Sequence, residues 1–90
     1  MTTDSGDGPT DGDIVEAGAT AAREFVLSRF DTDEIRDLDV TVTFEDGVLE
    51  VDVYLDVPDP GSRDPGQVAD DAALTARRAV DRLFEETDGT

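Results

Sequence analysis

The stretch from residue 38 to residue 57 decides the fold, and it reads LDVTVTFEDGVLEVDVYLDV. Apolar and polar residues alternate on both sides of Asp46 and Gly47, a pattern typical of two half-buried strands. Asp-Gly favours a two-residue turn because both of its central positions need a positive φ. The sequence therefore predicts a β-hairpin.

The turn also predicts the register, because Glu45 and Val48 then face each other across the hairpin. The opposed pairs on one face are all apolar: Phe44 with Leu49, Val42 with Val51, Val40 with Val53, and Leu38 with Leu55. A slip of one residue would place acidic side chains on that face. The register is therefore strongly specified.

A helix is predicted on each side of the hairpin. Asp13 and Glu16 have the spacing of a capping box, so the first helix is expected to run from Asp13 to about Phe30. The second is expected to follow Asp64 as N-cap and to end near Glu86. At helical spacing the apolar stripes contain Ile14, Gly18, Ala21, Ala22 and Phe25 in the first helix, and Val68, Ala69, Ala72, Ala73, Ala76, Ala79, Val80, Leu83 and Phe84 in the second.

The order helix, strand, strand, helix predicts a two-layer α+β fold, α-β-β-α, with both helices on one face of an antiparallel hairpin. Residues 1–12 are interpreted as a disordered acidic tail, 13–86 as one domain and 87–90 as a polar tail. A two-stranded sheet is marginally stable, and its two unpaired edges are templates for association. We therefore expect dimerisation to extend the sheet.

The 90-residue chain has 24 acidic and 7 basic residues, a net charge of -17. The regular apolar pattern argues against a disordered chain. Adaptation to a salty cytoplasm explains the acidity, because at ~1 M salt the Debye length is only about 3 Å. No signal peptide or membrane-spanning run is found, so a cytoplasmic protein is expected.

The absence of His and Cys excludes Ser/His and Cys/His catalysis and makes a zinc site improbable. Glu50, Asp52 and Thr41 are a conceivable cation site, but a solvated acidic face is the favoured interpretation. No catalytic, cofactor-binding or metal-ligating residue is predicted.

Arg77, Arg78 and Arg82 are the only basic cluster of the chain. Ion pairing with Asp81, Glu85 and Glu86 at helical spacing is the favoured interpretation, ahead of RNA contact. Direct nucleic-acid binding by the isolated chain is not expected, because the overall charge repels polyanions.

Five large apolar residues fall outside the predicted core and are the candidates for a protein interface. They are Leu27, Phe30, Val48, Tyr54 and Leu74.

The segments 37–58, DLDVTVTFEDGVLEVDVYLDVP, and 67–74, QVADDAAL, resemble a family of small archaeal proteins labelled as a domain of unknown function. The resemblance covers about residues 14–84 and carries no catalytic motif. The order of elements is also similar to that of the small Pcc-type subunits of the archaeal KEOPS complex, which makes threonylcarbamoyl-adenosine in tRNA. Those subunits usually have a strand before the first helix, for which residues 1–12 are unsuited.

The resemblance implies a non-catalytic accessory subunit that forms a homodimer, or a heterodimer with a Pcc-type subunit, by joining sheets and helices. Two alternatives stay open at this point. One is a homodimeric binding module of another archaeal complex, such as a chaperone or ribosome-linked assembly. The other, which is least favoured, is a small enzyme that uses surface carboxylates with a metal ion.

Overall fold

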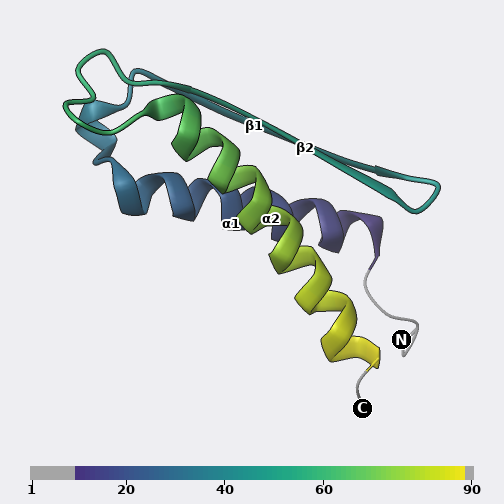
Figure 1. Ribbon diagram of the computed structural model, residues 1–90. Helices are drawn as coiled ribbons and strands as arrows, with labels where there is room; N and C mark the ends of the chain where they lie inside the picture. Colours follow the sequence, from purple (N-terminus) through teal and green to yellow (C-terminus); the bar gives the residue numbers. More distant parts are fainter. Residues whose placement is uncertain (1–9, 89–90) are drawn as a thin grey trace.

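The structure is a computed structural model that describes the backbone of residues 10–88 and the side chains of residues 10–85. Its elements are α1 (Asp11–Arg29), the 3-10 turn η1 (Thr32–Glu34), β1 (Asp37–Glu45), β2 (Val48–Asp56) and α2 (Pro65–Asp88). Figure 1 shows the hairpin as one layer and both helices as a second layer on one side of it. The predicted two-layer α+β fold is confirmed. Of the predicted tails, residues 1–9 and 89–90 lie outside the described part.

The hairpin has the register that the Asp-Gly turn predicts. Glu45 faces Val48, and the pairing continues without interruption to Asp37 opposite Asp56. Asp46 and Gly47 have φ angles of 54° and 79°, as a two-residue turn with two left-handed residues requires. The alternation of the two strands therefore places one apolar face against the helices.

The start of α1 differs from the prediction. The hydroxyl of Thr10 accepts a hydrogen bond of 3.1 Å from the Asp13 amide, and the Asp13 carboxylate accepts one of 3.2 Å from the Thr10 amide. Thr10 is therefore the N-cap, and the prediction that Asp13 caps the helix is wrong. Asp13 takes the reciprocal position of the capping box, three residues inside.

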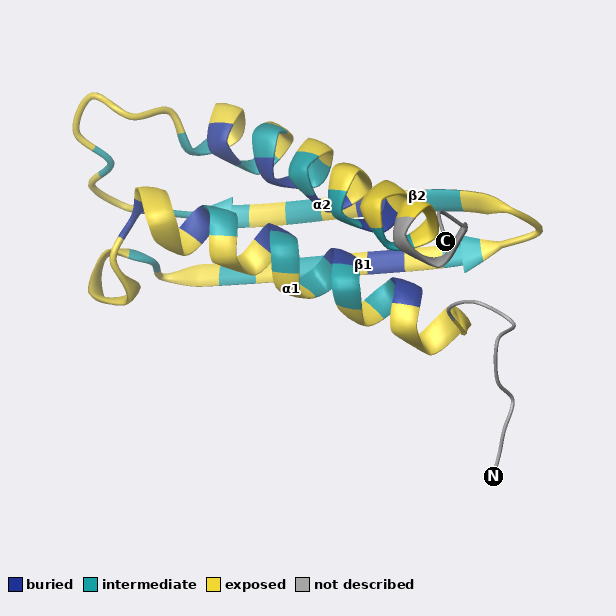
Figure 2. Ribbon diagram, turned by 90° about the horizontal axis from the view of Figure 1, so that it is seen from below, coloured by how far each residue is buried: buried dark blue, intermediate teal, exposed yellow. Residues whose placement is uncertain are grey.

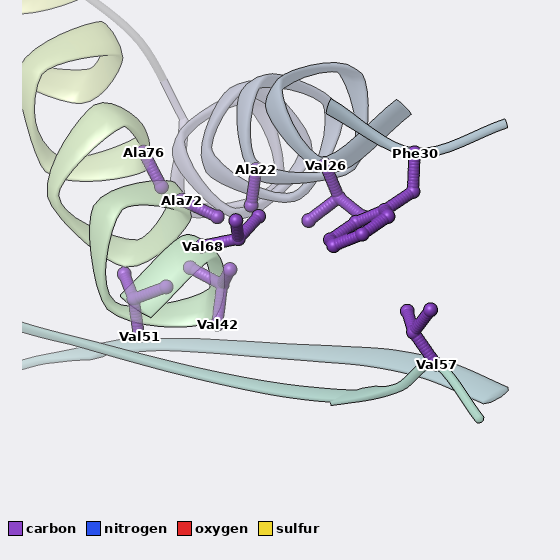
Figure 3. Close-up of a cluster of buried hydrophobic side chains, with 9 residues drawn as sticks. All are labelled: Ala22, Val26, Phe30, Val42, Val51, Val57, Val68, Ala72 and Ala76. Atoms are coloured by element: carbon purple, nitrogen blue, oxygen red, sulfur yellow. The ribbon is translucent and has the colours of Figure 1, made fainter. Parts of the chain in front are cut away.

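The end of α1 corrects a second prediction, because Phe30 lies in the core and only 3% of it is exposed. Phe30 is the C-cap residue and its backbone is extended, with φ -133° and ψ 140°. Its side chain therefore does not point where helical spacing would place it, and the prediction that Phe30 lies outside the core is wrong. Figure 3 shows the ring beside Val26 and over Val57.

Small residues bring the two helices close to each other and to the sheet. Ala22, Ala72 and Ala76 are fully buried where α1 and α2 meet over the strands. A Cβ atom at Gly18 would lie 3.4 Å from Cγ1 of Val42, so α1 approaches β1 closely there. In Figure 2 the helices lie side by side, α1 along β1 and α2 along β2, with their buried residues towards the strands.

The start of α2 confirms the predicted cap, because the carboxylate of Asp64 accepts a hydrogen bond of 3.0 Å from the Gly66 amide. At the C-terminal end of α2, the predicted core differs from the observed one. Figure 1 shows the C-terminal half of α2 moving away from the hairpin, so the predicted core residue Phe84 is 41% exposed. Its ring still contacts the ring of Phe44 on β1.

Candidate functional site

Within residues 10–88, no further strand pairs with either outer edge of the hairpin, so both edges are open. In a two-residue hairpin the pair next to the turn exchanges hydrogen bonds, and bonded and non-bonded pairs then alternate. The core-facing pairs, such as Val42 with Val51, are the non-bonded ones, so their amides and carbonyls point outwards. Among residues 10–88, the hairpin backbone makes one hydrogen bond besides those between its two strands. In it the Arg36 amide donates to the Asp56 carbonyl, at 2.8 Å.

The open edges are long for an isolated hairpin. Each strand has nine residues, which corresponds to about 30 Å of edge. Neither strand contains proline or lysine, two residue types with which proteins commonly protect an edge. The edges are therefore suited to the addition of a strand from another chain.

Four of the five interface candidates are exposed, as the sequence predicts. The exposed fractions are 40% for Leu27, 58% for Val48, 56% for Tyr54 and 47% for Leu74. The structure does not bring them together: Val48 and Tyr54 stand on the outer face of β2, whereas Leu27 and Leu74 belong to different helices. Phe30, the fifth, is excluded by its burial. A role of the other four in an interface stays a prediction.

A second surface feature is an open groove of about 380 Å³ between α1 and α2. Its apolar lining comes from Ala21 and Phe25 on α1 and from Ala79 on α2, with Thr75 beside them. Its charged lining comes from Glu24, Arg78 and Arg82, which are all exposed. The groove thus has an apolar floor between the two helices and exposed charged residues at its opening to solvent.

The ion pairs expected for the arginine cluster are not formed with the neighbours whose side chains are described. Within residues 10–85, the single ion pair shorter than 4.0 Å joins Arg36 to Asp56, at 3.0 Å. Asp81 and Glu85 therefore do not pair with Arg77, Arg78 or Arg82. The predicted partner Glu86 has no described side chain.

The conceivable cation site on the outer sheet face gains no support from the geometry. Thr41 faces Asp52 across the hairpin, and Glu50 lies two residues along β2. Among the described residues, no three Asp or Glu side chains are grouped so that they could hold a metal ion.

Sequence reasoning missed the groove, because a groove between helices depends on how the helices pair. The available signal was one of spacing. Ala21 and Phe25 are four residues apart on α1. On α2, Thr75 and Ala79 are also four residues apart, and Arg82 follows three residues later, so they share one helix face. Two such stripes indicate a shared surface only once the helices are known to be neighbours.

No helix within the described range 10–88 combines the length and the apolar character that crossing a membrane requires.

Comparisons with known proteins find sequence similarity over most of the chain. The family described as "Protein of unknown function (DUF3194)" matches residues 11–83. An uncharacterized protein of Natronomonas pharaonis is 52% identical over 85 residues, which cover 94% of this chain and 100% of the relative.

Two solved structures have the same fold, each with a TM-score of 0.68. One is a crystal structure from Thermococcus onnurineus NA1, with 26% identity, covering 84% of this chain and 77% of the other. The other is the solution structure of a hypothetical protein from Methanothermobacter thermautotrophicus, with 28% identity, covering 96% of this chain and 97% of the other.

Proposed function

Since this chain belongs to the DUF3194 family of proteins of unknown function, we propose a function from its geometry: it is a non-catalytic subunit that joins its sheet to that of another protein chain. The observation that carries the proposal is the pair of open, nine-residue strand edges. A two-stranded sheet gains stability when a further strand satisfies the outward-pointing amides and carbonyls of an edge.

The β1 edge is the better of the two for this pairing. The centre of β1 carries Thr41 and Thr43 on its outer face, whereas the centre of β2 carries Glu50 and Asp52. Threonine favours strands and pairs well across them, but aspartate and glutamate do not. A strand added at β1 therefore meets uncharged neighbours at its centre.

The β1 edge is also better than the β2 edge for pairing between two copies of this chain. If two β1 strands pair about their centres, Thr41 lies opposite Thr41 of the second copy. If two β2 strands do so, Asp52 lies opposite Asp52, and like charges directly opposite each other destabilise a sheet. Both a homodimer and a heterodimer are therefore expected to use β1.

The partner that we propose is a Pcc-type subunit of the archaeal KEOPS complex, which makes threonylcarbamoyl-adenosine in tRNA. This proposal is supported by the similar order of elements and by the archaeal source of the relatives. A homodimer that serves another archaeal complex is the second candidate, and the same β1 edge favours it.

Affinity purification of the tagged chain from its host, in about 2 M KCl to screen its charge, tests the proposal. Wild type is expected to recover a Pcc-type protein. Thr41→Lys, which places a charge that opposes strand addition at the centre of the β1 edge but faces Asp52 favourably within its own hairpin, is expected to recover much less. Thr20→Lys makes the same change on the exposed side of α1 and is expected to recover as much as wild type.

Recovery of unrelated proteins alone would contradict the KEOPS assignment. Light scattering of the purified chain then identifies the second candidate, because a homodimer has twice the monomer mass. Thr41→Lys would return it to the monomer, since the two lysines would lie opposite each other. A wild-type chain that is monomeric and recovers no protein would contradict sheet joining altogether.

A further inference from the structure

We propose that the groove between α1 and α2 is a docking site for an acidic amphipathic helix of a partner protein. The proposal is independent of the sheet edges, because every residue that lines the groove belongs to one of the two helices. If both hold, the chain bridges two partners, one at the hairpin and one at the helices.

The shape of the groove favours a segment of a protein over a small molecule. Small ligands are usually enclosed, with most of their surface buried. This groove is open to solvent along the contact of the two helices, and its volume is about 380 Å³. An open groove covers one side of its occupant, as when an amphipathic helix lays its apolar face between two helices.

The apolar lining matches such a face. Ala21 and Ala79 are small and leave space between the helices, and Phe25 offers an aromatic ring. The guanidinium of Arg29 lies over that ring, 4.4 Å from its centre, so the ring is held by a cation-π contact. Apolar side chains of a docked helix would be covered by these residues.

The charges of the groove specify an acidic occupant. Arg78 and Arg82 line it one helical turn apart, and like charges at this spacing repel each other. Among the described side chains neither arginine has an ion pair, and Glu24 in the same groove is not within 4.0 Å of their nitrogen atoms. A carboxylate between the two guanidinium groups would relieve the repulsion and form charge-assisted hydrogen bonds.

The net charge of the chain favours a protein occupant over a nucleic acid. A charge of -17 repels a polyanion at every phosphate. An amphipathic helix with a few acidic residues meets much less of this repulsion. In concentrated salt the Debye length is about 3 Å, so the distant repulsion is screened more strongly than a direct contact with the arginines.

The test is an NMR titration of the ¹⁵N-labelled chain in about 2 M KCl, with a synthetic amphipathic peptide of leucine, alanine and glutamate. The peptide is expected to shift the amide signals of Phe25, Thr75 and Ala79. The double variant Arg78→Glu, Arg82→Glu is expected to bind it at least about tenfold more weakly.

Arg77→Glu is the matched control for these two changes. It reverses an exposed arginine of the same helix that does not line the groove, and it is expected to change binding by less than about twofold. A peptide with lysine in place of glutamate is expected not to bind. Circular dichroism of each variant confirms that the helices are intact.

Four outcomes would overturn the proposal. The first two concern the peptides: the acidic peptide leaves the groove signals unchanged, or the lysine peptide binds equally well. In the third, a single-stranded oligonucleotide shifts the same signals at lower concentration. In the fourth, the signals move with protein concentration alone, which would make a second copy the occupant. Loss of binding in Arg77→Glu equal to that of the double variant would also contradict it, because general charge would then explain the affinity.

Discussion

The rings of Phe44 and Phe84 meet with their centroids 6.3 Å apart and an angle of 43° between their planes. This contact joins the turn end of β1 to the last turns of α2, where the helix moves away from the sheet (Figure 1). The two rings therefore close the core at its open end.

Phe84→Ala is expected to lower the free energy of unfolding by about 1–2 kcal/mol, less than for a fully buried ring because Phe84 is 41% exposed. Thermal unfolding followed by circular dichroism measures the change. Leu74→Ala is the control, because Leu74 is similarly exposed, at 47%, but takes no part in the ring contact. Equal losses in the two variants would show that the ring contact contributes nothing.

The approach of α1 to β1 at Gly18 predicts opposite effects for two substitutions. The Cβ atom of alanine would lie 3.4 Å from Val42 and 3.6 Å from Val80, within ordinary contact distance. Gly18→Ala is therefore expected to stabilise the fold by about 0.5–1 kcal/mol through helix propensity. Gly18→Leu is expected to destabilise it by about 1–3 kcal/mol, because the space is already filled. Denaturant titration of both variants should give opposite signs, and two equal losses would contradict this packing.

At the turn, a substitution of Gly47 is expected to lower stability through the backbone conformation alone. Gly47 has a φ of 79°, and a Cβ atom there would have no atom within 4 Å. Gly47→Ala is expected to lower the free energy of unfolding by about 1–2 kcal/mol, because alanine disfavours the left-handed region. Asp46→Gly, at a φ of 54°, is expected to be neutral or stabilising. A neutral Gly47→Ala variant would mean that the turn is not the two-residue turn described.

The acidic surface predicts that the fold depends on salt. The chain carries a net charge of -17, and the described side chains contain one ion pair that could offset the repulsion. In falling KCl the melting temperature is expected to decrease, because carboxylates screened at about 1 M salt repel one another in dilute buffer. Circular dichroism at a series of KCl concentrations measures this. A melting temperature that is the same in dilute buffer would contradict the predicted adaptation to high salt.

The sequence predicts the hairpin well because alternation and turn chemistry are local. Once Asp46 and Gly47 form the turn, each pair down to Asp37 with Asp56 follows by counting. The ends of α1 are less predictable for a physical reason. Thr10 and Asp13 can each begin a capping box, and the choice between them depends on which reciprocal bonds form.

The two errors on the core concern residues at the C-terminal ends of the two helices. Helical spacing places Phe30 outside the core, but the extended backbone at the C-cap turns it inwards. Helical spacing also places Phe84 in the core, but the divergence of α2 from the sheet leaves it partly exposed. Both errors depend on tertiary geometry that a periodic pattern does not contain.

Of the two candidate sites, the sequence predicts the strand edges but not the groove. Open strand edges follow from counting two strands, and the threonines and acids on their outer faces follow from alternation. The groove does not follow from the sequence, because it requires Phe25 and Ala79 from two separate helices to line one surface.

Amide hydrogen exchange of the assembled complex, measured by NMR, tests whether the partner's strand pairs with the β1 edge. The outward-pointing amides of Val40 and Val42 on β1 are expected to exchange at least about tenfold more slowly in the complex than in the free chain. The corresponding amides of Val51 and Val53 on β2 are expected to keep their rates. Protection of the β2 amides instead, or unchanged exchange at both edges, would rule out pairing at β1.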